Sequence, residues 1–195
     1  MTCLTPDTPA SDSDILALVA ADAWMMAALE AVAALGLPDG WIGAGFARGA
    51  VWDRLHGYSS RTPLDDIDVI YFDPETLDPA AEAVLERRLD ERLPGLPWEV
   101  RNQARMHLRN DDPPYRSSAD ALAHWLETPT AIGVRLNDGG GPELLAPLGT
   151  GDLLGLVVRP TPHARAHEHR LASYRERLER KNWPARWPMM QLIWE

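Results

Sequence analysis

The sequence predicts an α+β fold in which a small mixed β-sheet is flanked by helices. It is α/β-like because helices and strands alternate along the first half of the chain. Stretches with helical periodicity alternate with short apolar stretches of strand type, and Gly- and Pro-rich turns separate them. The chain has 195 residues, of which 45% are apolar and 25% charged, as in an ordinary globular protein. We therefore expect a loose segment over residues 1–13 and a single domain over 14–195, with a helical C-terminal extension from about residue 159.

In the first half of the chain, helix-capping residues and Gly- or Pro-containing turns mark where the expected helices and strands begin and end. A helix is expected over residues 14–35, with Ser13 as its N-cap and GLPDG as its end. A short strand (41–44), a helix (45–56), an acidic strand (66–72), a charged amphipathic helix (78–92), a strand (98–101) and a helix (102–110) follow.

The second half is predicted to be mostly helical, with one hairpin. A helix is expected over residues 119–126. Strands at 131–136 and 143–146 flank the glycine turn NDGGG, which predicts the hairpin. A long helix over 162–181 then leads to the aromatic, Pro-containing end of the chain.

Composition limits the classes of partner. The sequence contains no long apolar span and no secretory leader, and its single cysteine, Cys3, cannot form a disulfide within the chain. A reducing cytoplasm is the expected location, with no membrane partner. The net charge is −10, but residues 159–194 carry 8 basic against 3 acidic side chains. This segment can meet an anion locally, although the whole chain would not attract nucleic acid at long range.

The acidic segment TPLDDIDVIYFD suggests a metal site. In a strand, Asp66, Asp68 and Ile70 share one face, so two carboxylates stand side by side. Each carboxylate raises the pKa of the other, and a bridging divalent cation removes that repulsion. The alternative is that these aspartates are ordinary turn and edge-strand residues.

The glycines of GAGFARG, residues 43–49, allow two interpretations. A dinucleotide site would want glycine at position 48, which is Arg, and a ribose-binding acid at the end of a strand, whereas Asp66 and Asp68 begin theirs. The alternative is a phosphate cradle, in which Gly45 lets a phosphate approach the start of a helix and Arg48 clamps it or braces the acids. With carboxylates on the adjacent strand to hold Mg²⁺, this arrangement suits nucleotidyl transfer.

These residues also resemble a known family. AGFARGAVWDRLHG followed by PLDDIDV is similar to the glycine, x, x, Arg and Asp-x-Asp motifs of the DNA polymerase beta nucleotidyltransferase superfamily. Together with WEVRNQARMH, they resemble a bacterial nucleotidyltransferase-like family within it, over residues 14–190. The resemblance implies a nucleotidyltransferase fold, two Mg²⁺ ions at Asp66 and Asp68, and an NTP over Gly45. The chain departs from the pattern at Ala44, often glycine, and Gly49, often Asp or Asn.

The third strand offers further candidates. Glu99 is the best third carboxylate, as metal ligand and as base for the acceptor hydroxyl, if its strand pairs beside the acidic strand. The alternative is a solvent-facing Glu99 paired with Arg101, and a one-residue change of register would instead turn Val100 and Asn102 toward the metals. A polar cluster at the start of the next helix could contact base or ribose, or could simply cap that helix and face solvent: Asn102, Gln103, Arg105 and His107.

Two functional hypotheses follow. The first is an Mg²⁺-dependent nucleotidyltransferase that transfers NMP from an NTP to an unidentified acceptor. The second is a nucleotide-binding or partner-binding module of the same fold without turnover. The predicted helix 162–181 carries arginines on one face that could be merely solvated or could hold an anionic acceptor: Arg165, Arg170, Arg175, Arg177 and Arg180.

Overall fold

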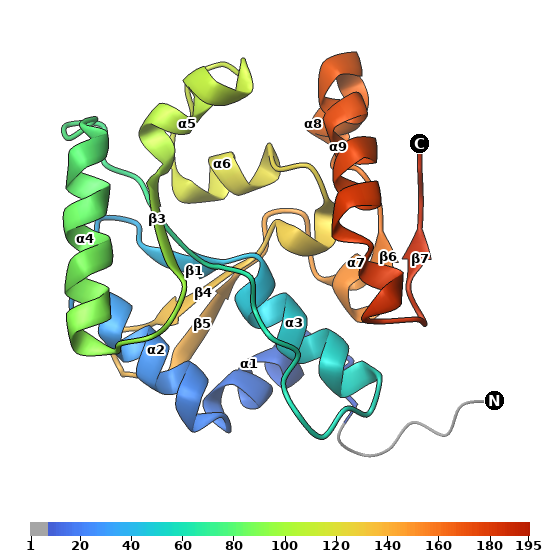
Figure 1. Cartoon of the computed structure of the whole chain (residues 1–195), viewed down its shortest axis with the longest axis horizontal. Helices are drawn as coiled ribbons and strands as arrows, with labels where there is room; N and C mark the ends of the chain where they lie inside the picture. Colours follow the sequence, from blue (N-terminus) through green and yellow to red (C-terminus); the bar gives the residue numbers. More distant parts are fainter. Residues whose placement is uncertain (1–7) are drawn as a thin grey trace.

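The computed structural model describes residues 8–195 and confirms a mixed α+β architecture (Figure 1). Its central sheet has the strand order β3-β2-β1-β4-β5, where β1 is antiparallel to both β2 and β4, β2 is parallel to β3, and β4 and β5 form the predicted hairpin. The strands are β1 (Trp41–Gly43), β2 (Ile67–Tyr71), β3 (Trp98–Asn102), β4 (Gly133–Leu136) and β5 (Pro142–Leu145).

Helices surround this sheet. They are α1 (Asp12–Ala20), α2 (Ala23–Ala33), α3 (Gly45–Leu55), α4 (Pro79–Arg92), α5 (Gln103–Asn110), α6 (Ser118–Ala123), α7 (Gly151–Leu154), α8 (Pro162–Ala166) and α9 (Glu168–Lys181). Short 3-10 turns lie at Thr128–Thr130 and Trp183–Ala185. Figure 1 shows α5 and α9 rising on two sides of α6, away from the sheet.

The single helix expected over residues 14–35 is wrong, because the chain breaks it into α1 and α2. Ser11, not Ser13, caps α1. Asp22 starts α2 by accepting hydrogen bonds from the amides of Trp24 and Met25, and it also pairs with Arg61. A good N-cap inside an apolar run thus begins a new helix. Within residues 8–195, no single helix is both long and apolar enough to cross a membrane, and α1 and α2 pass that test only as a pair bent by 91°.

The C-terminal region also differs from expectation. The helix expected over 162–181 is divided at His167, whose extended backbone (φ −125°, ψ 116°) separates α8 from α9. The helix expected over 119–126 ends at Ala123. Two short parallel strands, β6 (Val157–Val158) and β7 (Gln191–Leu192), were not predicted, because two-residue strands have no periodicity to detect. Most of the loose segment predicted over residues 1–13, including Cys3, lies outside the described residues, and its last residues, Asp12 and Ser13, belong to α1.

The two faces of the sheet have different environments. Strand β2 alternates as predicted: Ile67, Val69 and Tyr71 point into the main core, whereas Ile70 packs on the other face with Trp41 and Leu122. The main core is formed with side chains from α1, α2, α3 and α4, including Ile15, Met25, Leu29, Phe46, Val51 and Leu89. The second face is only partly covered, so polar side chains of β2 and β3 can meet a ligand there.

The C-terminal segment is tied to the site region. Asp65, directly before the acidic pair, forms ion pairs with Lys181 at the end of α9 and with Arg186. Asp53 of α3 accepts a hydrogen bond from the Trp187 indole at 2.8 Å. These contacts fix α9 beside the start of β2, although the two are far apart in the sequence.

Candidate functional site

The acidic pair lies at the start of β2, on the partly covered face of the sheet. Within residues 8–195, neither the side chain of Asp66 nor that of Asp68 forms a hydrogen bond or an ion pair. Burial, together with the nearby charges of Asp66 and Glu99, raises the pKa of Asp68 to about 6. The structure therefore keeps two carboxylates close together without a cationic partner in contact, which is costly unless a ligand compensates it.

The first turn of α3 faces this pair. Its N-cap, Ala44, makes no side-chain capping bond and has a backbone conformation that favours glycine (φ 47°, ψ −119°). A Cβ atom added at Gly45 would lie 3.4 Å from Nη2 of Arg48. An uncapped helix start beside a residue without a side chain is suited to close approach of a phosphate.

Arg48 is the most unusual side chain of the site. It is only 7% exposed, yet within residues 8–195 its guanidinium has no hydrogen bond and no ion pair, and its Nε is fully buried. Its charge lies over the rings of Trp52 and Trp183, 4.8 and 4.7 Å from their centroids. Burial lowers the pKa of Arg48 to about 10, and nearby Arg177 lowers it too, so the group stays cationic at neutral pH.

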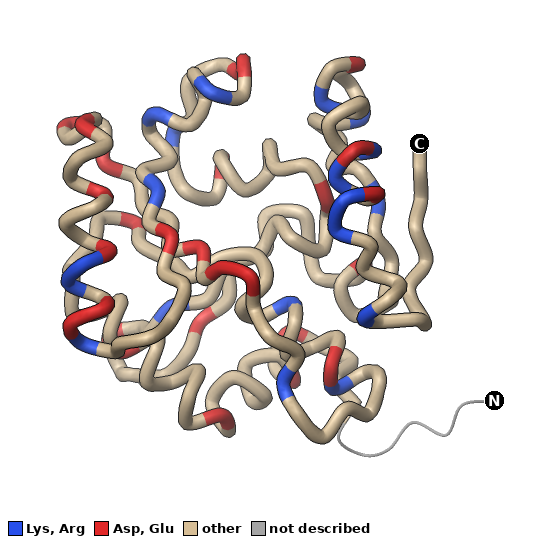
Figure 2. Tube along the Cα trace, viewed as in Figure 1, with Lys and Arg blue, Asp and Glu red and all other residues tan. Residues whose placement is uncertain are grey.

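A cleft of about 340 Å³ opens over the site. Its lining includes Ala44, Asp68, Ile70 and Glu99 from the sheet side, and residues of α5, α9 and the segment around Trp125. Four arginines line it: Arg101, Arg109, Arg170 and Arg177. Figure 2 shows acidic residues along β2 and β3 in the centre of the molecule and basic residues gathered on α9. The cleft therefore joins carboxylates on one wall to cations on another.

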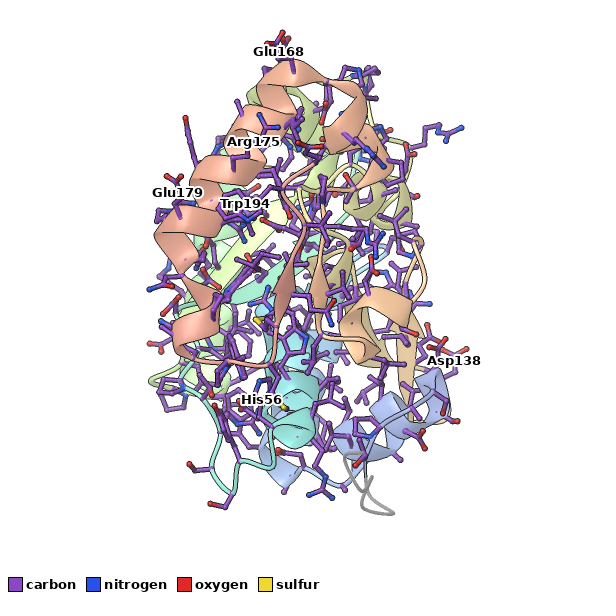
Figure 3. The ribbon with its side chains drawn as sticks, turned by 90° about the vertical axis from the view of Figure 1, so that its right-hand side faces the viewer. His56, Asp138, Glu168, Arg175, Glu179 and Trp194 are labelled. Atoms are coloured by element: carbon purple, nitrogen blue, oxygen red, sulfur yellow. The ribbon has the colours of Figure 1, made fainter. Side chains whose placement is uncertain are left out.

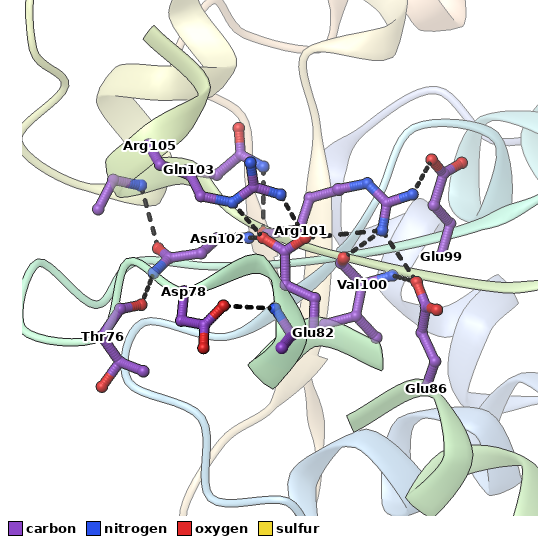
Figure 4. A network of polar contacts seen from close by, with 12 residues as sticks. Thr76, Asp78, Glu82, Glu86, Glu99, Val100, Arg101, Asn102, Gln103 and Arg105 are labelled. Carbon is purple, nitrogen blue, oxygen red and sulfur yellow. Dashed lines mark hydrogen bonds and ion pairs between the residues drawn. The ribbon is translucent and has the colours of Figure 1, made fainter. Parts of the chain in front are cut away.

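Strand β3 places Glu99 beside the acidic pair. In the parallel register, Asp68 is opposite Glu99, and both line the cleft. Glu99 also pairs with Arg101 (Nη2 to Oε1, 2.6 Å), as the alternative interpretation expected. Arg101 in turn reaches Glu86 at 2.9 Å (Figure 4). Both features that the sequence left as alternatives are thus present together.

Asn102 has a different environment. Its Oδ1 accepts from the amides of Asp73 and Ala104, and its Nδ2 donates to the carbonyls of Asp73 and Thr76. It is 1% exposed and is the N-cap of α5. Its carboxamide is therefore occupied by backbone groups, as the capping interpretation expected, and it does not line the cleft.

The neighbours of Asn102 in the expected polar cluster have two different environments. Arg105 binds buried Glu82 through Nε at 2.8 Å (Figure 4), whereas Gln103 lines the cleft.

The residues present fit a divalent cation only in part. Among the described residues 8–195, no three His, Cys, Asp or Glu side chains converge as a preformed metal site. Asp66 and Asp68, unpaired and mutually repelling, are the donor set that a hard cation such as Mg²⁺ prefers. Glu99 holds Arg101 through Oε1 alone, so its second oxygen, Oε2, has no protein partner among the described residues and could join them.

Some residues of the site carry no signal in the sequence. Trp183, which stacks on Arg48, comes from a turn after α9, and Glu127, 1% exposed, pairs with Arg177 at 2.7 Å. Thr130 holds the second oxygen of Glu127 at 2.8 Å. Only tertiary packing brings these side chains to the cleft, although the basic face of α9 was a partial indication.

The sequence matches the model of a family described as nucleotidyltransferase, over residues 30–192. Among solved structures, one described as a CCA-adding enzyme head domain has 37% identity and a TM-score of 0.86, and the match covers 96% of this chain and 98% of that one. No curated protein matches the chain.

Two solved chains described as a tRNA-processing enzyme, in two apo forms, have a related fold. Each is 18% identical, with TM-scores of 0.50 and 0.51. The matches cover 85% and 86% of this chain but only 44% and 42% of those chains, so this chain spans less than half of their length. At this identity the likeness shows the fold alone.

Proposed function

This chain belongs to the nucleotidyltransferase family, and from that premise we propose that it transfers NMP from an NTP to a hydroxyl group of an acceptor, with Mg²⁺ bound at Asp66 and Asp68. The observation that carries the proposal is the buried, unpaired guanidinium of Arg48 beside the uncapped start of α3. A buried charge without a partner is costly. A triphosphate at Gly45 supplies that partner.

The residues of the proposed site divide the reaction among them. Gly45 and the first amides of α3 hold the phosphates, and Arg48 neutralises charge on the leaving pyrophosphate. The acceptor oxygen forms a bond to the α-phosphorus, the bond from that phosphorus to the pyrophosphate oxygen breaks, and Glu99 accepts the hydroxyl proton. Bound Mg²⁺ would lower the hydroxyl pKa and align the reacting groups.

The acceptor is a separate part of the proposal. The similar solved structures are described as a CCA-adding enzyme head domain and a tRNA-processing enzyme. We therefore include the 3′-hydroxyl of an RNA among the first acceptors to test. The cleft is lined by residues of α5 and α9 as well as by Asp68 and Glu99, so an acceptor would approach the carboxylates along these two helices.

Two observations favour a second function. Glu99 is held by Arg101, and the chain has strained Ala44 where the superfamily often has glycine. A protein of this kind could bind a nucleotide without turning it over. The two functions differ in turnover and not in binding, so one experiment separates them.

The experiment measures binding and turnover in parallel. Each of the four NTPs is tested for Mg²⁺-dependent thermal stabilisation, where a ligand at 100 times its Kd adds about 2.7 kcal/mol, and for pyrophosphate release with RNA present or absent. In Arg48→Met, which keeps bulk between the two tryptophans, we expect ATP affinity to fall much more than adenosine affinity. Binding without pyrophosphate release supports the binding module, and no Mg²⁺-dependent NTP binding overturns the proposal.

A further inference from the structure

The outer end of the cleft contains a pair of cations that the proposed nucleotide site does not use. Arg109 comes from the last turn of α5 and Arg170 from the first turns of α9, and both line the cleft. In Figure 1 the end of α5 and the start of α9 face each other above α6, away from the sheet. Two helices distant in the sequence thus bring two guanidinium groups to one opening.

Arg170 is buried and only partly neutralised. Its side chain is 10% exposed, and its Nη2 donates to the carbonyl of His124 at 2.7 Å. Its nearest carboxylate oxygen, on Asp112, is 4.0 Å away, because that carboxylate already accepts from Tyr115 and from His163. The buried Nε of Arg170 has no hydrogen-bond partner. A donor in this state is costly unless a ligand accepts from it.

Arg109 adds a free charge. It is exposed, and within the described part of the chain its side chain forms no ion pair and no hydrogen bond. Asn110, next to it, lines the same cleft and donates from Nδ2 to Tyr115 at 3.0 Å. Arg109, Arg170 and Asp112 together carry a net charge of +1, although the chain as a whole carries −10.

Arg170 is distinct from the inner cation of the same helix. Arg177 lies close enough to Asp68 and Arg48 to alter the pKa values of both. Arg170 is seven residues earlier on α9, which is roughly 10 Å along the helix axis. Arg177 therefore belongs with the phosphates of the NTP, whereas Arg170 faces whatever enters from the outer end.

We infer that Arg109 and Arg170 form a binding site for a phosphate group of the acceptor, so that the acceptor is a phosphorylated molecule whose hydroxyl reaches toward Asp68 and Glu99. That the ligand is an acceptor rests on the proposed function, whereas the phosphate site itself is inferred from Arg109 and Arg170 alone. Arginine forks bind phosphate oxygens in pairs, and a ligand of this kind satisfies both the buried Nε of Arg170 and the free charge of Arg109.

The test uses two phosphate sources, each with an uncharged partner. Ribose 5-phosphate is compared with ribose, and a short single-stranded RNA with the same sequence carrying methylphosphonate linkages, by titration calorimetry with a non-hydrolysable ATP analogue and Mg²⁺ present. We expect at least one phosphate probe to bind at least about tenfold more tightly than its uncharged partner. Preference for ribose 5-phosphate identifies a small phosphorylated acceptor, and preference for RNA identifies a nucleic-acid end.

Variants then assign the site. Arg170→Gln and Arg109→Gln should each weaken the phosphate probe about tenfold and change the Kd of the ATP analogue less than twofold. Arg180→Gln, an exposed arginine of the same helix outside the cleft, is the matched control. Arg109 is exposed, so its variant keeps the test valid if Arg170→Gln does not fold.

Three outcomes overturn the inference: no phosphate preference in the parent protein, no loss in the two variants, or an equal loss for the ATP analogue, which would place both arginines in the nucleotide site. Both phosphate probes are also titrated without nucleotide, into the parent and into Arg109→Gln. If the parent does not bind the ATP analogue but still binds a phosphate probe in a way that depends on Arg109, the proposed function fails and the phosphate site stands.

Discussion

Asp68 of β2 and Glu99 of β3 are direct partners in the parallel register and face the same cleft. Asp68 has no ion pair, whereas Glu99 is held by Arg101 at 2.6 Å. The two carboxylates therefore differ in what they can do without ligand. Both oxygens of Asp68 are available to a cation, whereas Arg101 occupies Oε1 of Glu99 and leaves only Oε2 available.

The titration of Asp68 predicts an effect of pH on stability. Its folded pKa is about 6, above the ordinary value of 3.8, so its protonated form stabilises the fold below about pH 4 and this contribution is lost as pH rises through 6. Asp68→Asn does not titrate. We expect it to be more stable than the parent at pH 7 by on the order of 2 kcal/mol, and the difference to shrink toward pH 4.

Urea unfolding at pH 4, 5 and 7 measures that difference, and the same variant should lose Mg²⁺-dependent stabilisation by NTP. If the unfolding free energies of parent and variant change in parallel with pH, or if the response to Mg²⁺ is unchanged, Asp66 and Asp68 are ordinary turn and edge-strand residues and not a metal site.

Glu99→Gln separates binding from chemistry. If Glu99 accepts the hydroxyl proton, we expect the variant to bind Mg²⁺ and NTP normally but to turn over at least about a hundredfold more slowly. Glu86→Gln is the matched control, because Glu86 also pairs with Arg101 but does not line the cleft. Parent-like turnover in Glu99→Gln, measured as pyrophosphate release, would remove the base role from this residue.

Gly45→Ala tests the close approach of phosphate. The added Cβ lies 3.4 Å from Nη2 of Arg48, an ordinary contact, so the fold should persist while the space for a phosphate is reduced. We expect affinity for Mg²⁺ and ATP to fall about tenfold or more, or roughly 1.4 kcal/mol. Gly49→Ala, one turn later and 3.5 Å from Leu64, should leave ATP affinity unchanged. Equal effects of the two changes would argue against a phosphate at Gly45.

Ala44→Gly tests the strained start of α3. Alanine at φ 47° and ψ −119° is unfavourable by on the order of 1 kcal/mol or more, and glycine relieves it. We expect an unfolding free energy equal to or above that of the parent, by up to about 1 kcal/mol. Ala47→Gly, in the interior of the same helix, should instead lose about 1 kcal/mol. Similar losses in both variants, measured by urea unfolding, would show that Ala44 carries no strain.

The local pattern of the chain determined most of the scaffold and the acidic pair. Period-two alternation in DDIDVIY predicted that Asp68 lies on the face opposite Ile67, Val69 and Tyr71, and glycines and caps marked α3 and α4. Where two local patterns competed, the prediction failed, as at Asp22, whose side chain begins a second helix inside a continuous apolar run. Short-range physics is sufficient for these features because each depends on neighbours within a few residues.

Only the tertiary structure decided what surrounds the acids. The pairing register of β2 and β3 decides whether Glu99, or instead Val100 and Asn102, lies beside Asp68. The alternating pattern of β3 is compatible with both registers. Trp183 reaches Arg48, Arg177 reaches Glu127, and Arg170 reaches the cleft because α9 folds back over the molecule and is tied to Asp65. Figure 3 shows the outer side of the same helix, where Arg175 instead lies near Trp194 and donates to its carbonyl at 3.2 Å. The helical pattern of the sequence shows which arginines share a face of α9. Packing against residues distant in the sequence determines which of these faces lies at the cleft.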